Sequence, residues 1–368
     1  MNVGVVACIN SCCGKELTKS CWFLKNMITS VRFNNFYSFA DEAVIDFTLG
    51  KQPAPSGFDI NLGAKRLNKV IAVVGANGSG KTQFIKSLAF LCWFVCDSFL
   101  GTDPDDDIAY SPHKLKAGED TLLEMDFILN GIDHRYQLVI NQRKVVSEAL
   151  YVRTSSQYSY VFKREKSGGG FSFRQKGFPF PKAQAENLRA NTSLLAAAHS
   201  YDVKEARPYI EYFRRIVPNV GSAGRAHFQP SSVRYAAELY EKDSDLKVRM
   251  VEAMREFDLG LTDVTIEKLK GADGDILYLP FGHHFTSSGS VFTLPFFEES
   301  SGTQSAFALL ERILTVLLQG GLAVIDEIDN DLHPHLVPVI LDWFRFEHTN
   351  PLQAQLIFTC HTPEVLDR

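Results

Sequence analysis

Residues 75–82 read Gly75-Ala76-Asn77-Gly78-Ser79-Gly80-Lys81-Thr82, and they are the most specific motif in the chain. It matches the pattern G-x-x-x-x-G-K-[S/T] of a phosphate-binding loop, or P-loop. The short apolar run at residues 70–74 comes before it and is typical of a buried parallel strand. Residues 82–99 come after it as a long, largely apolar segment without glycine or proline, which predicts a buried helix. Strand, glycine loop and helix in this order predict an α/β fold.

The residue types of this loop suit a nucleoside triphosphate and its magnesium ion. Glycines let backbone N–H groups turn toward phosphates, and the helix N-terminus adds the positive end of its dipole. Lys81 can neutralise the β- and γ-phosphates during binding and catalysis, and Thr82 can offer its hydroxyl to Mg²⁺. We therefore predict ATP and Mg²⁺ as cofactors, with the ATP-binding residues Gly75, Asn77, Gly78, Ser79, Gly80, Lys81, Thr82 and Gln83.

A second apolar run, residues 322–325, ends in two adjacent acids, Asp326 and Glu327. Unpaired buried charge is expensive, so a buried strand that ends in two carboxylates indicates a cation or a water molecule that needs them. In the Walker B interpretation Asp326 holds the magnesium ion, and Glu327 orients and deprotonates the attacking water. The alternative is an ordinary strand end that is exposed to solvent.

A third candidate segment, residues 299–304, lies directly before an apolar segment at residues 306–319 that predicts a helix. Ser300 or Ser301 can serve as its N-cap, and Ser301 with Gly302 at a helix N-terminus can present N–H groups and a hydroxyl to an anion. The simpler interpretation is a capped helix without a ligand.

The order of these motifs resembles that of ABC and SMC ATPase heads over residues 27–99 and 297–368. The resemblance extends to a D-loop at residues 328–334, which includes Asp329, and to a switch histidine, His361, that would contact the γ-phosphate or the attacking water. It implies an ABC-type P-loop ATPase head with an antiparallel β-lobe and an inserted helical lobe. It also implies that Ser301 and Gly302 act on the ATP of a second subunit, in a homodimer or a higher assembly.

Within that class the chain looks like stand-alone defence ATPases, namely the OLD-type and PtuA-like proteins related to RecF. The resemblance rests on residues 35–39, 299–304 and 326–334. It implies an ATPase that gates a partner effector in anti-phage defence, with an HNH-type nuclease as the partner. Two alternatives stay open: a RecF-like DNA repair ATPase, and an OLD-type ATPase whose nuclease part lies beyond residue 368. The RecF-like alternative would use basic residues such as Arg214, Arg215, Arg225 and Arg234 to bind DNA.

Hydrophobic periodicity divides the rest of the chain. Period-two alternation around Asn130-Gly131, and again around residues 167–170, predicts two β-hairpins. Residues 203–217 and 231–257 have a helical pattern, and strand-like pieces return at residues 276–281 and 291–297. We predict four parts: an irregular extension (1–26), the first part of the head (27–182), a helical insert (183–270) and the second part of the head (271–368).

Composition excludes several other classes of protein. The net charge of −5 and the pI near 6.1 do not fit a protein that coats nucleic acid nonspecifically, although a local basic groove is compatible with them. No apolar run approaches the roughly 20 residues that span a bilayer, so we expect a cytoplasmic chain without a membrane role. Cys8, Cys12, Cys13 and Cys21 lack zinc-site spacing. We expect structural roles for His283 and His284, and we find no Q-loop glutamine at residues 111–120.

Overall fold

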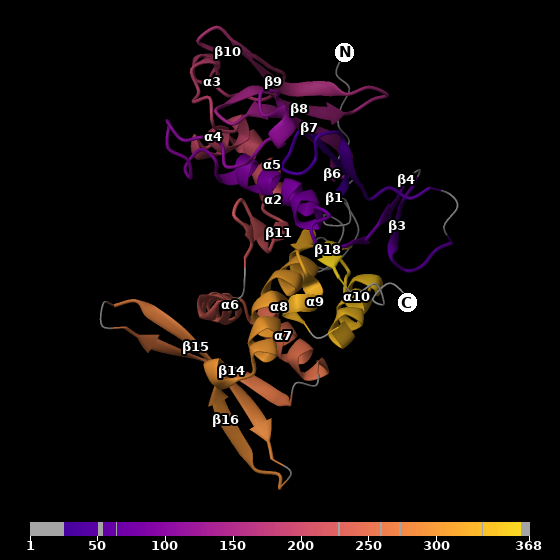
Figure 1. Ribbon diagram of the computed structural model, residues 1–368, viewed down its shortest axis with the longest axis vertical. Helices are drawn as coiled ribbons and strands as arrows, with labels where there is room; N and C mark the ends of the chain where they lie inside the picture. Colours follow the sequence, from indigo (N-terminus) through magenta and orange to yellow (C-terminus); the bar gives the residue numbers. More distant parts are fainter. Residues whose placement is uncertain are drawn as a thin grey trace, which may run out of the picture.

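The computed structural model describes residues 26–50, 54–63, 65–226, 229–257, 260–271, 274–286, 288–332 and 334–361. The four N-terminal cysteines, and all of the predicted extension except Asn26, lie outside the described residues. Figure 1 shows strands of residues 121–175 at one end of the molecule and strands of residues 261–295 at the other, with a small parallel sheet between them.

The parallel sheet has four strands, in the order β11 (Ile216–Pro218), β17 (Leu322–Ile325), β18 (Gln355–Cys360) and β5 (Val70–Val74). The predicted strand before the P-loop is thereby confirmed. The register pairs Ile325 with Phe358 and Cys360 with Val74, so the carboxyl ends of β17, β18 and β5 meet at one edge. Ligands of open α/β sheets bind beyond that edge. The P-loop, Asp326 and His361 follow these three strands directly.

The parallel sheet separates two hydrophobic cores. Along β17, Leu322 and Val324 join one core, while Ala323 and Ile325 join the other, as the two-residue period of a strand requires. The first core holds the helices α2 (Lys81–Asp97), α4 (Leu194–Ser200) and α5 (Arg207–Phe213), and the second holds α6 (Pro230–Lys242), α7 (Ser244–Glu256), α8 (Ser301–Gln319) and α10 (Val337–Arg345). Since both faces are covered, the strands are apolar without alternation.

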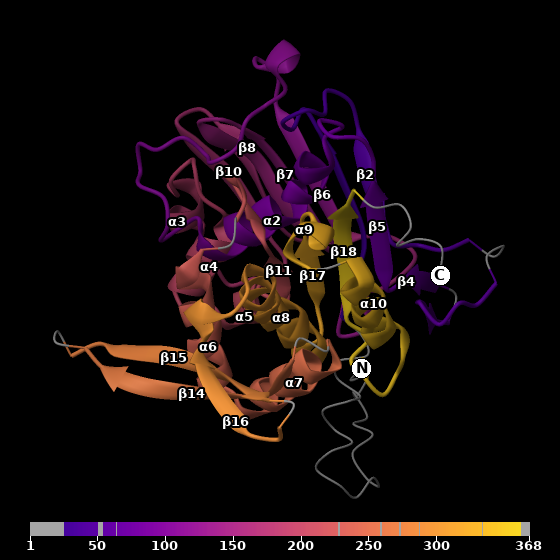
Figure 2. The same ribbon diagram turned by 60° about the horizontal axis from the view of Figure 1, so that its bottom comes forward.

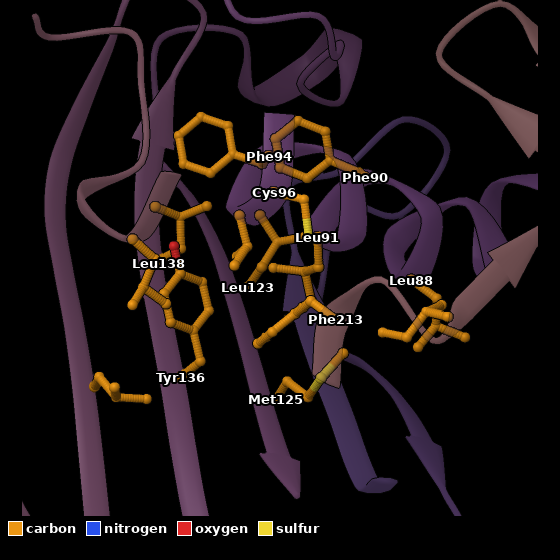
Figure 3. Packing of buried hydrophobic residues seen from close by; sticks show 14 of the residues in the cluster. Leu88, Phe90, Leu91, Phe94, Cys96, Leu123, Met125, Tyr136, Leu138 and Phe213 are labelled. Carbon is orange, nitrogen blue, oxygen red and sulfur yellow. The ribbon is translucent and has the colours of Figure 1, made fainter. Parts of the chain in front are cut away.

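A seven-stranded antiparallel sheet packs on the other side of α2. Its order is β10 (Gly170–Gln175), β9 (Ser159–Ser167), β8 (Lys144–Arg153), β7 (Ile132–Asn141), β6 (Thr121–Leu129), β1 (Met27–Asn34) and β2 (Ala43–Asp46). Both predicted hairpins are confirmed, β6–β7 and β9–β10. Asn130 and Gly131 have φ values of 54° and 75°, and two positive φ values are what a two-residue I′ turn needs. Figure 3 shows Leu123 and Leu138 of the sheet facing Leu91 of α2.

A buried ion pair joins this sheet to α4. Glu148 and Arg164 have fully buried side chains, and the guanidinium lies 2.7 Å from Oε2 of Glu148. The carboxylate also accepts hydrogen bonds from the Tyr136 hydroxyl (2.9 Å), the Ser193 hydroxyl (2.9 Å) and the Leu194 amide (2.8 Å). These four donor groups compensate the free energy lost when the carboxylate is removed from water. A buried carboxylate without such partners would be strongly unfavourable.

Residues 183–270 contain helices but also strands, which the helical pattern did not predict. The helix predicted over residues 203–217 ends at Phe213. Pro218 favours an extended backbone conformation for the residue before it, and residues Ile216–Pro218 form a strand that pairs with β17. The pattern at residues 231–257 is two helices, because the Asp243 side chain caps the amides of Asp245 and Leu246 and starts α7 there. The boundaries of the four parts stay predictions.

A three-stranded antiparallel sheet, β14 (Leu261–Lys270), β15 (Ile276–Phe285) and β16 (Val291–Pro295), projects beyond α6 and α7 (Figure 2). The remaining elements are β3 (Asp59–Leu62), β4 (Lys65–Asn68), α3 (Lys182–Glu186), β12 (Val220–Gly221), β13 (Gly224–Arg225), α9 (Ile328–Asp331) and four short 3₁₀ turns. The predicted fold class is confirmed: an α/β chain with a P-loop core and a large antiparallel sheet. The projecting lobe mixes helices with strands.

Candidate functional site

The P-loop connects β5 to α2 and is exposed at residues 76–79. Gly78 and Gly80 have φ values of 78° and 94°, which L side chains rarely adopt. A Cβ on Gly78 would meet no atom within 4 Å, whereas a Cβ on Gly80 would lie 2.9 Å from the Ser38 hydroxyl. The loop therefore keeps an open backbone surface at the start of α2, where N–H groups can receive phosphates.

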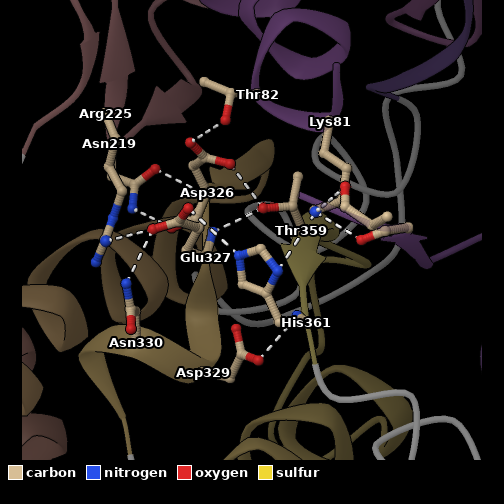
Figure 4. A network of polar contacts seen from close by, with 12 residues as sticks. Lys81, Thr82, Asn219, Arg225, Asp326, Glu327, Asp329, Asn330, Thr359 and His361 are labelled. Carbon is tan, nitrogen blue, oxygen red and sulfur yellow. Dashed lines mark hydrogen bonds and ion pairs between the residues drawn. The ribbon is translucent and has the colours of Figure 1, made fainter. Parts of the chain in front are cut away.

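Lys81 links the P-loop to the acidic strand through His361. Its ammonium donates to the carbonyl oxygens of Gly75 (2.7 Å) and Ala76 (3.2 Å) and lies 3.4 Å from Nδ1 of His361. An ammonium can only donate, so Nδ1 is the acceptor in this contact and Nε2 is the ring nitrogen left to donate. That nitrogen faces Oε1 of Glu327 at 3.4 Å, as Figure 4 shows.

Asp326 lies at the end of β17 with an exposed fraction of 1%, and two hydroxyl groups donate to its carboxylate. Thr82 donates to Oδ2 at 2.8 Å and Thr359 to Oδ1 at 2.6 Å. A threonine hydroxyl beside a carboxylate is an oxygen donor set that Mg²⁺ prefers. Nearby along α2, Oε1 of Gln83 is buried and accepts no hydrogen bond from any described residue. These oxygens, together with the open P-loop, fit a magnesium ion and the phosphates that accompany it.

Glu327 follows Asp326 in a left-handed conformation, with φ 51° and ψ 57°. Such a conformation in a residue other than glycine is strained and clusters at functional sites. Its Oε2 accepts from Arg225 (2.7 Å) and Asn330 (3.0 Å), while Oε1 faces His361. Burial alone would raise the pKa of Glu327, but the hydrogen bonds from His361 and Asn330 and the charge of Arg225 together hold that pKa below its ordinary value.

Asn219, at the end of β11, is a site residue that sequence reasoning missed. Its amide nitrogen donates to the backbone carbonyl of Asp326 (3.1 Å), and its carbonyl oxygen accepts from the backbone N–H of Asp326 (2.7 Å). Asn219 is 4% exposed, so both bonds are shielded from water. Because the strand that carries it went unrecognised, no local signal identified this asparagine.

The segment at residues 111–120, which contains no glutamine, precedes β6. The Asn35 side chain holds it by donating to the carbonyls of Lys116 (3.0 Å) and Glu119 (2.9 Å).

The remaining predicted site residues lie on α9 and α8. Asp329 accepts a hydrogen bond at 2.8 Å from the backbone N–H of His361, so it helps to fix the position of that histidine. The N-cap of α8 is Ser300, whose hydroxyl accepts from the Thr303 amide at 3.1 Å. Ser301 and Gly302 are exposed in the first turn of α8, and among the described residues neither forms a hydrogen bond with the P-loop.

Three of the four arginines named in the RecF-like alternative have partners within the fold. Arg225 points to Glu327, and its side chain is only 8% exposed. Arg215 donates to the Gln319 carbonyl at the other end of α8 (2.9 Å), and Arg214 lies 3.9 Å from Asp97. Arg214 and Arg215 thus have separate partners, Arg225 belongs to the acidic site, and the use of these arginines for nucleic acid stays a prediction.

His283 and His284 have the structural contacts that we expected. His283 bonds to the hydroxyls of Thr265 (2.9 Å) and Thr293 (3.1 Å), both on neighbouring strands. His284 lies 2.7 Å from Oε1 of Glu299, which ties β15 to the segment before α8. His283 therefore links the three strands of the sheet, and His284 links β15 to the segment before α8.

The fold and this site define a P-loop protein in which Thr82 of the P-loop helix contacts Asp326 at the end of the acidic strand β17. The chain belongs to the family described as "AAA domain, putative AbiEii toxin, Type IV TA system", whose model matches residues 70–367. That match includes every motif of the site. No curated protein matches the chain.

Solved structures of similar fold include SMC head domains. The chain is 15% identical to the SMC head domain from Thermotoga maritima, with 92% of this chain and 91% of that chain covered and a TM-score of 0.39. An SmcHead bound to the C-winged helix domain of ScpA is 11% identical, with 92% and 91% covered and a TM-score of 0.42. A Pyrococcus furiosus Smc head with an extended coiled coil, bound to the C-terminal domain of ScpA, is 11% identical, with 93% and 91% covered and a TM-score of 0.40.

In the part of the chain that the structure describes, no helix combines the length and the apolar character that crossing a membrane would need.

Proposed function

We propose that this chain binds ATP with Mg²⁺ and hydrolyses it at the edge where β5, β17 and β18 end. The contact between Thr82 and Asp326, at 2.8 Å, carries the proposal. It joins a residue of the P-loop helix to the acid strand, although the two residues are far apart in the sequence. A hydroxyl and a carboxylate at this position are oxygen ligands of the kind that a bound Mg²⁺ would use.

The roles of the residues follow from their positions. The exposed loop amides and Lys81 would hold the phosphates, and Thr82 and Asp326 would hold the magnesium ion. A bound magnesium ion neutralises charge that develops on the phosphates. Glu327 is the proposed general base, and His361, between Glu327 and Lys81, would fix the position of the attacking water or the γ-phosphate.

We further propose that two chains close around ATP. Ser301 and Gly302 lie exposed in the first turn of α8, and among the described residues they make no hydrogen bond to the P-loop of their own chain. A helix N-terminus of this kind offers N–H groups to an anion. Its proposed target is the γ-phosphate held by Lys81 of a second chain. ATP would then be part of the interface, and hydrolysis would open it because the closed state loses contacts that only ATP provides.

The proposed output of this cycle is control of an effector, and an HNH-type nuclease in anti-phage defence is the candidate from the sequence resemblance. The family's description also refers to a toxin and a toxin–antitoxin system, which is compatible with an ATPase that restrains or releases a harmful activity. This step of the proposal rests on the sequence resemblance.

Nucleotide binding and hydrolysis by three variants test the proposal. Lys81→Ala should weaken ATP binding about tenfold or more, since hydrogen bonds to charged groups contribute about 1.5–3 kcal/mol. Glu327→Gln should keep ATP affinity and lose hydrolysis about 10²- to 10⁴-fold, the usual contribution of a general base. Arg207→Ala, on an exposed ion pair of α5, is the control and should behave as wild type. Hydrolysis by Glu327→Gln at the wild-type rate would refute the assignment of the base.

Purification of the tagged chain from its native host tests the effector step. A nuclease that copurifies in the presence of ATP and dissociates after hydrolysis is expected. Binding to DNA ends or gaps with a steep salt dependence, without a protein partner, would contradict this part of the proposal.

A further inference from the structure

A small hairpin brings an arginine to the proposed catalytic base. Strands β12 and β13 follow β11 and place Arg225 against Glu327, with NH1 at 2.7 Å from Oε2. Their side chains are 8% and 28% exposed, so this ion pair is more shielded than a surface pair. An exposed pair would contribute little, but a shielded guanidinium that donates to a carboxylate fixes the orientation of that carboxylate.

The hairpin is attached to the site at both of its ends. At its base, Asn219 binds the backbone of Asp326 and accepts at its own carbonyl from the Ala226 amide (2.8 Å). At its tip, the Ser222 carbonyl accepts from the ammonium of Lys86 (3.1 Å), which lies on α2 one turn beyond the P-loop. The hairpin thus spans the Walker B strand and the P-loop helix, and Arg225 is held in place relative to both.

The donors around Glu327 divide its two oxygens unequally. Arg225 and Asn330 both donate to Oε2, whereas among the described residues His361, at 3.4 Å, is the one that faces Oε1. Glu327 precedes α9 and has a left-handed backbone conformation. The direction of its side chain is therefore not determined by the geometry of a regular helix. The orientation of the carboxylate is therefore set by the side chains that bind it, and Oε1 is the oxygen left on the side of His361 and Lys81.

We propose that Arg225 is a positioning residue for ATP hydrolysis: it holds Oε2 of Glu327 so that Oε1 is presented to the attacking water. The proposal rests on the proposed function, in which Glu327 is the general base. Arg225 itself touches neither water nor phosphate in this role and acts only through Glu327. A purely structural ion pair would instead support the fold and affect ATP binding and turnover together.

Steady-state and single-turnover ATPase kinetics of Arg225→Ala and Arg225→Lys separate these roles. We expect Arg225→Ala to lower kcat about 10- to 100-fold, because a small misplacement of a catalytic group has an effect of that size. The dissociation constant for ATP, measured separately, should stay within about threefold of wild type, a difference below 1 kcal/mol. Arg225→Lys should recover part of kcat because it keeps the charge but loses the planar fork. Arg207→Ala, an arginine from an exposed ion pair, is the matched control.

A double-mutant cycle with Glu327→Gln completes the test. If Arg225 acts through Glu327, adding Arg225→Ala to Glu327→Gln should change the single-turnover rate by less than about twofold. Additive losses, a kcat of Arg225→Ala within twofold of wild type, or a loss of ATP binding that equals the loss of kcat would each overturn the proposal. Wild-type hydrolysis by Glu327→Gln alone would instead refute the proposed function. If Arg225→Ala does not fold, Arg225→Gln, which keeps an N–H donor on a shorter, uncharged side chain, is judged by the same outcomes.

Discussion

Replacement of Asn219 by alanine should weaken both the fold and the site, because the Asn219 side chain is bonded to both backbone groups of Asp326. Two hydrogen bonds contribute about 1 kcal/mol each, and a buried N–H left without a partner costs about 1–3 kcal/mol. We therefore expect the free energy of unfolding to fall by about 3–5 kcal/mol. ATP turnover should fall as well, since Asp326 would lose the support that aligns it with Thr82.

Urea denaturation of the purified chain, with and without ATP and Mg²⁺, measures this loss. The slope of the transition should be unchanged, so that the shift in midpoint reports stability alone. Asn61→Ala is the matched control, because Asn61 lies on β3 and is exposed, and its replacement should change stability by no more than about 0.5 kcal/mol. A loss below 1 kcal/mol for Asn219→Ala, together with wild-type ATPase activity, would refute the argument that Asn219 supports Asp326.

Three further predictions concern other parts of the molecule. Arg164→Met should lower the free energy of unfolding by about 3–5 kcal/mol, because it leaves Glu148 charged and buried; chemical denaturation measures this, and a loss under 1 kcal/mol would contradict it. Burial raises the pKa of Glu311 in the folded chain above its value in the unfolded chain. At a pH above the raised pKa, the buried carboxylate is ionised and lowers the free energy of unfolding. This loss disappears when the pH falls below the pKa of the unfolded chain, because Glu311 is then protonated in both states. Glu311→Gln should therefore raise the melting temperature at neutral pH, with a gain that shrinks on acidification; a gain independent of pH would contradict this. Gly80→Ala should weaken ATP binding about tenfold in calorimetry, because a left-handed alanine costs about 1–2 kcal/mol and its Cβ would approach Ser38; unchanged affinity would show that the loop adapts.

Local patterns predicted the elements that local chemistry determines. The strand before the P-loop is Val70–Val74 as predicted, and α2 begins at Lys81, within the motif itself. The β6–β7 hairpin turns at Asn130-Gly131 because few residue pairs adopt two positive φ values. The sequence also named Thr82 and Asp326, which the structure brings into contact, because their residue types are tied to the chemistry of phosphate and magnesium; the roles of the Walker residues stay predictions.

Elements that depend on distant partners could not be predicted. Strand β11 has three residues, which is too short for a clear periodic pattern in the sequence. It is recognised as a strand by its pairing with β17, about a hundred residues later. Without β11, neither Asn219 nor the hairpin that carries Arg225 could be placed near Asp326. The ion pair between Arg225 and Glu327 likewise exists only in three dimensions, and from the sequence Arg225 was one of several basic residues. The predicted roles of Ser301, Gly302 and Asp329 toward nucleotide stay predictions.

In the proposed cycle, ATP closes two chains around a site in which Glu327 is the general base for hydrolysis. Light scattering of the Glu327→Gln chain, with and without ATP and Mg²⁺, tests it most directly. We predict a mass near that of the 41.2 kDa chain without nucleotide and twice that mass, or a larger assembly, with ATP. A chain that binds ATP, stays at the monomer mass and hydrolyses ATP as fast as wild type would contradict the account.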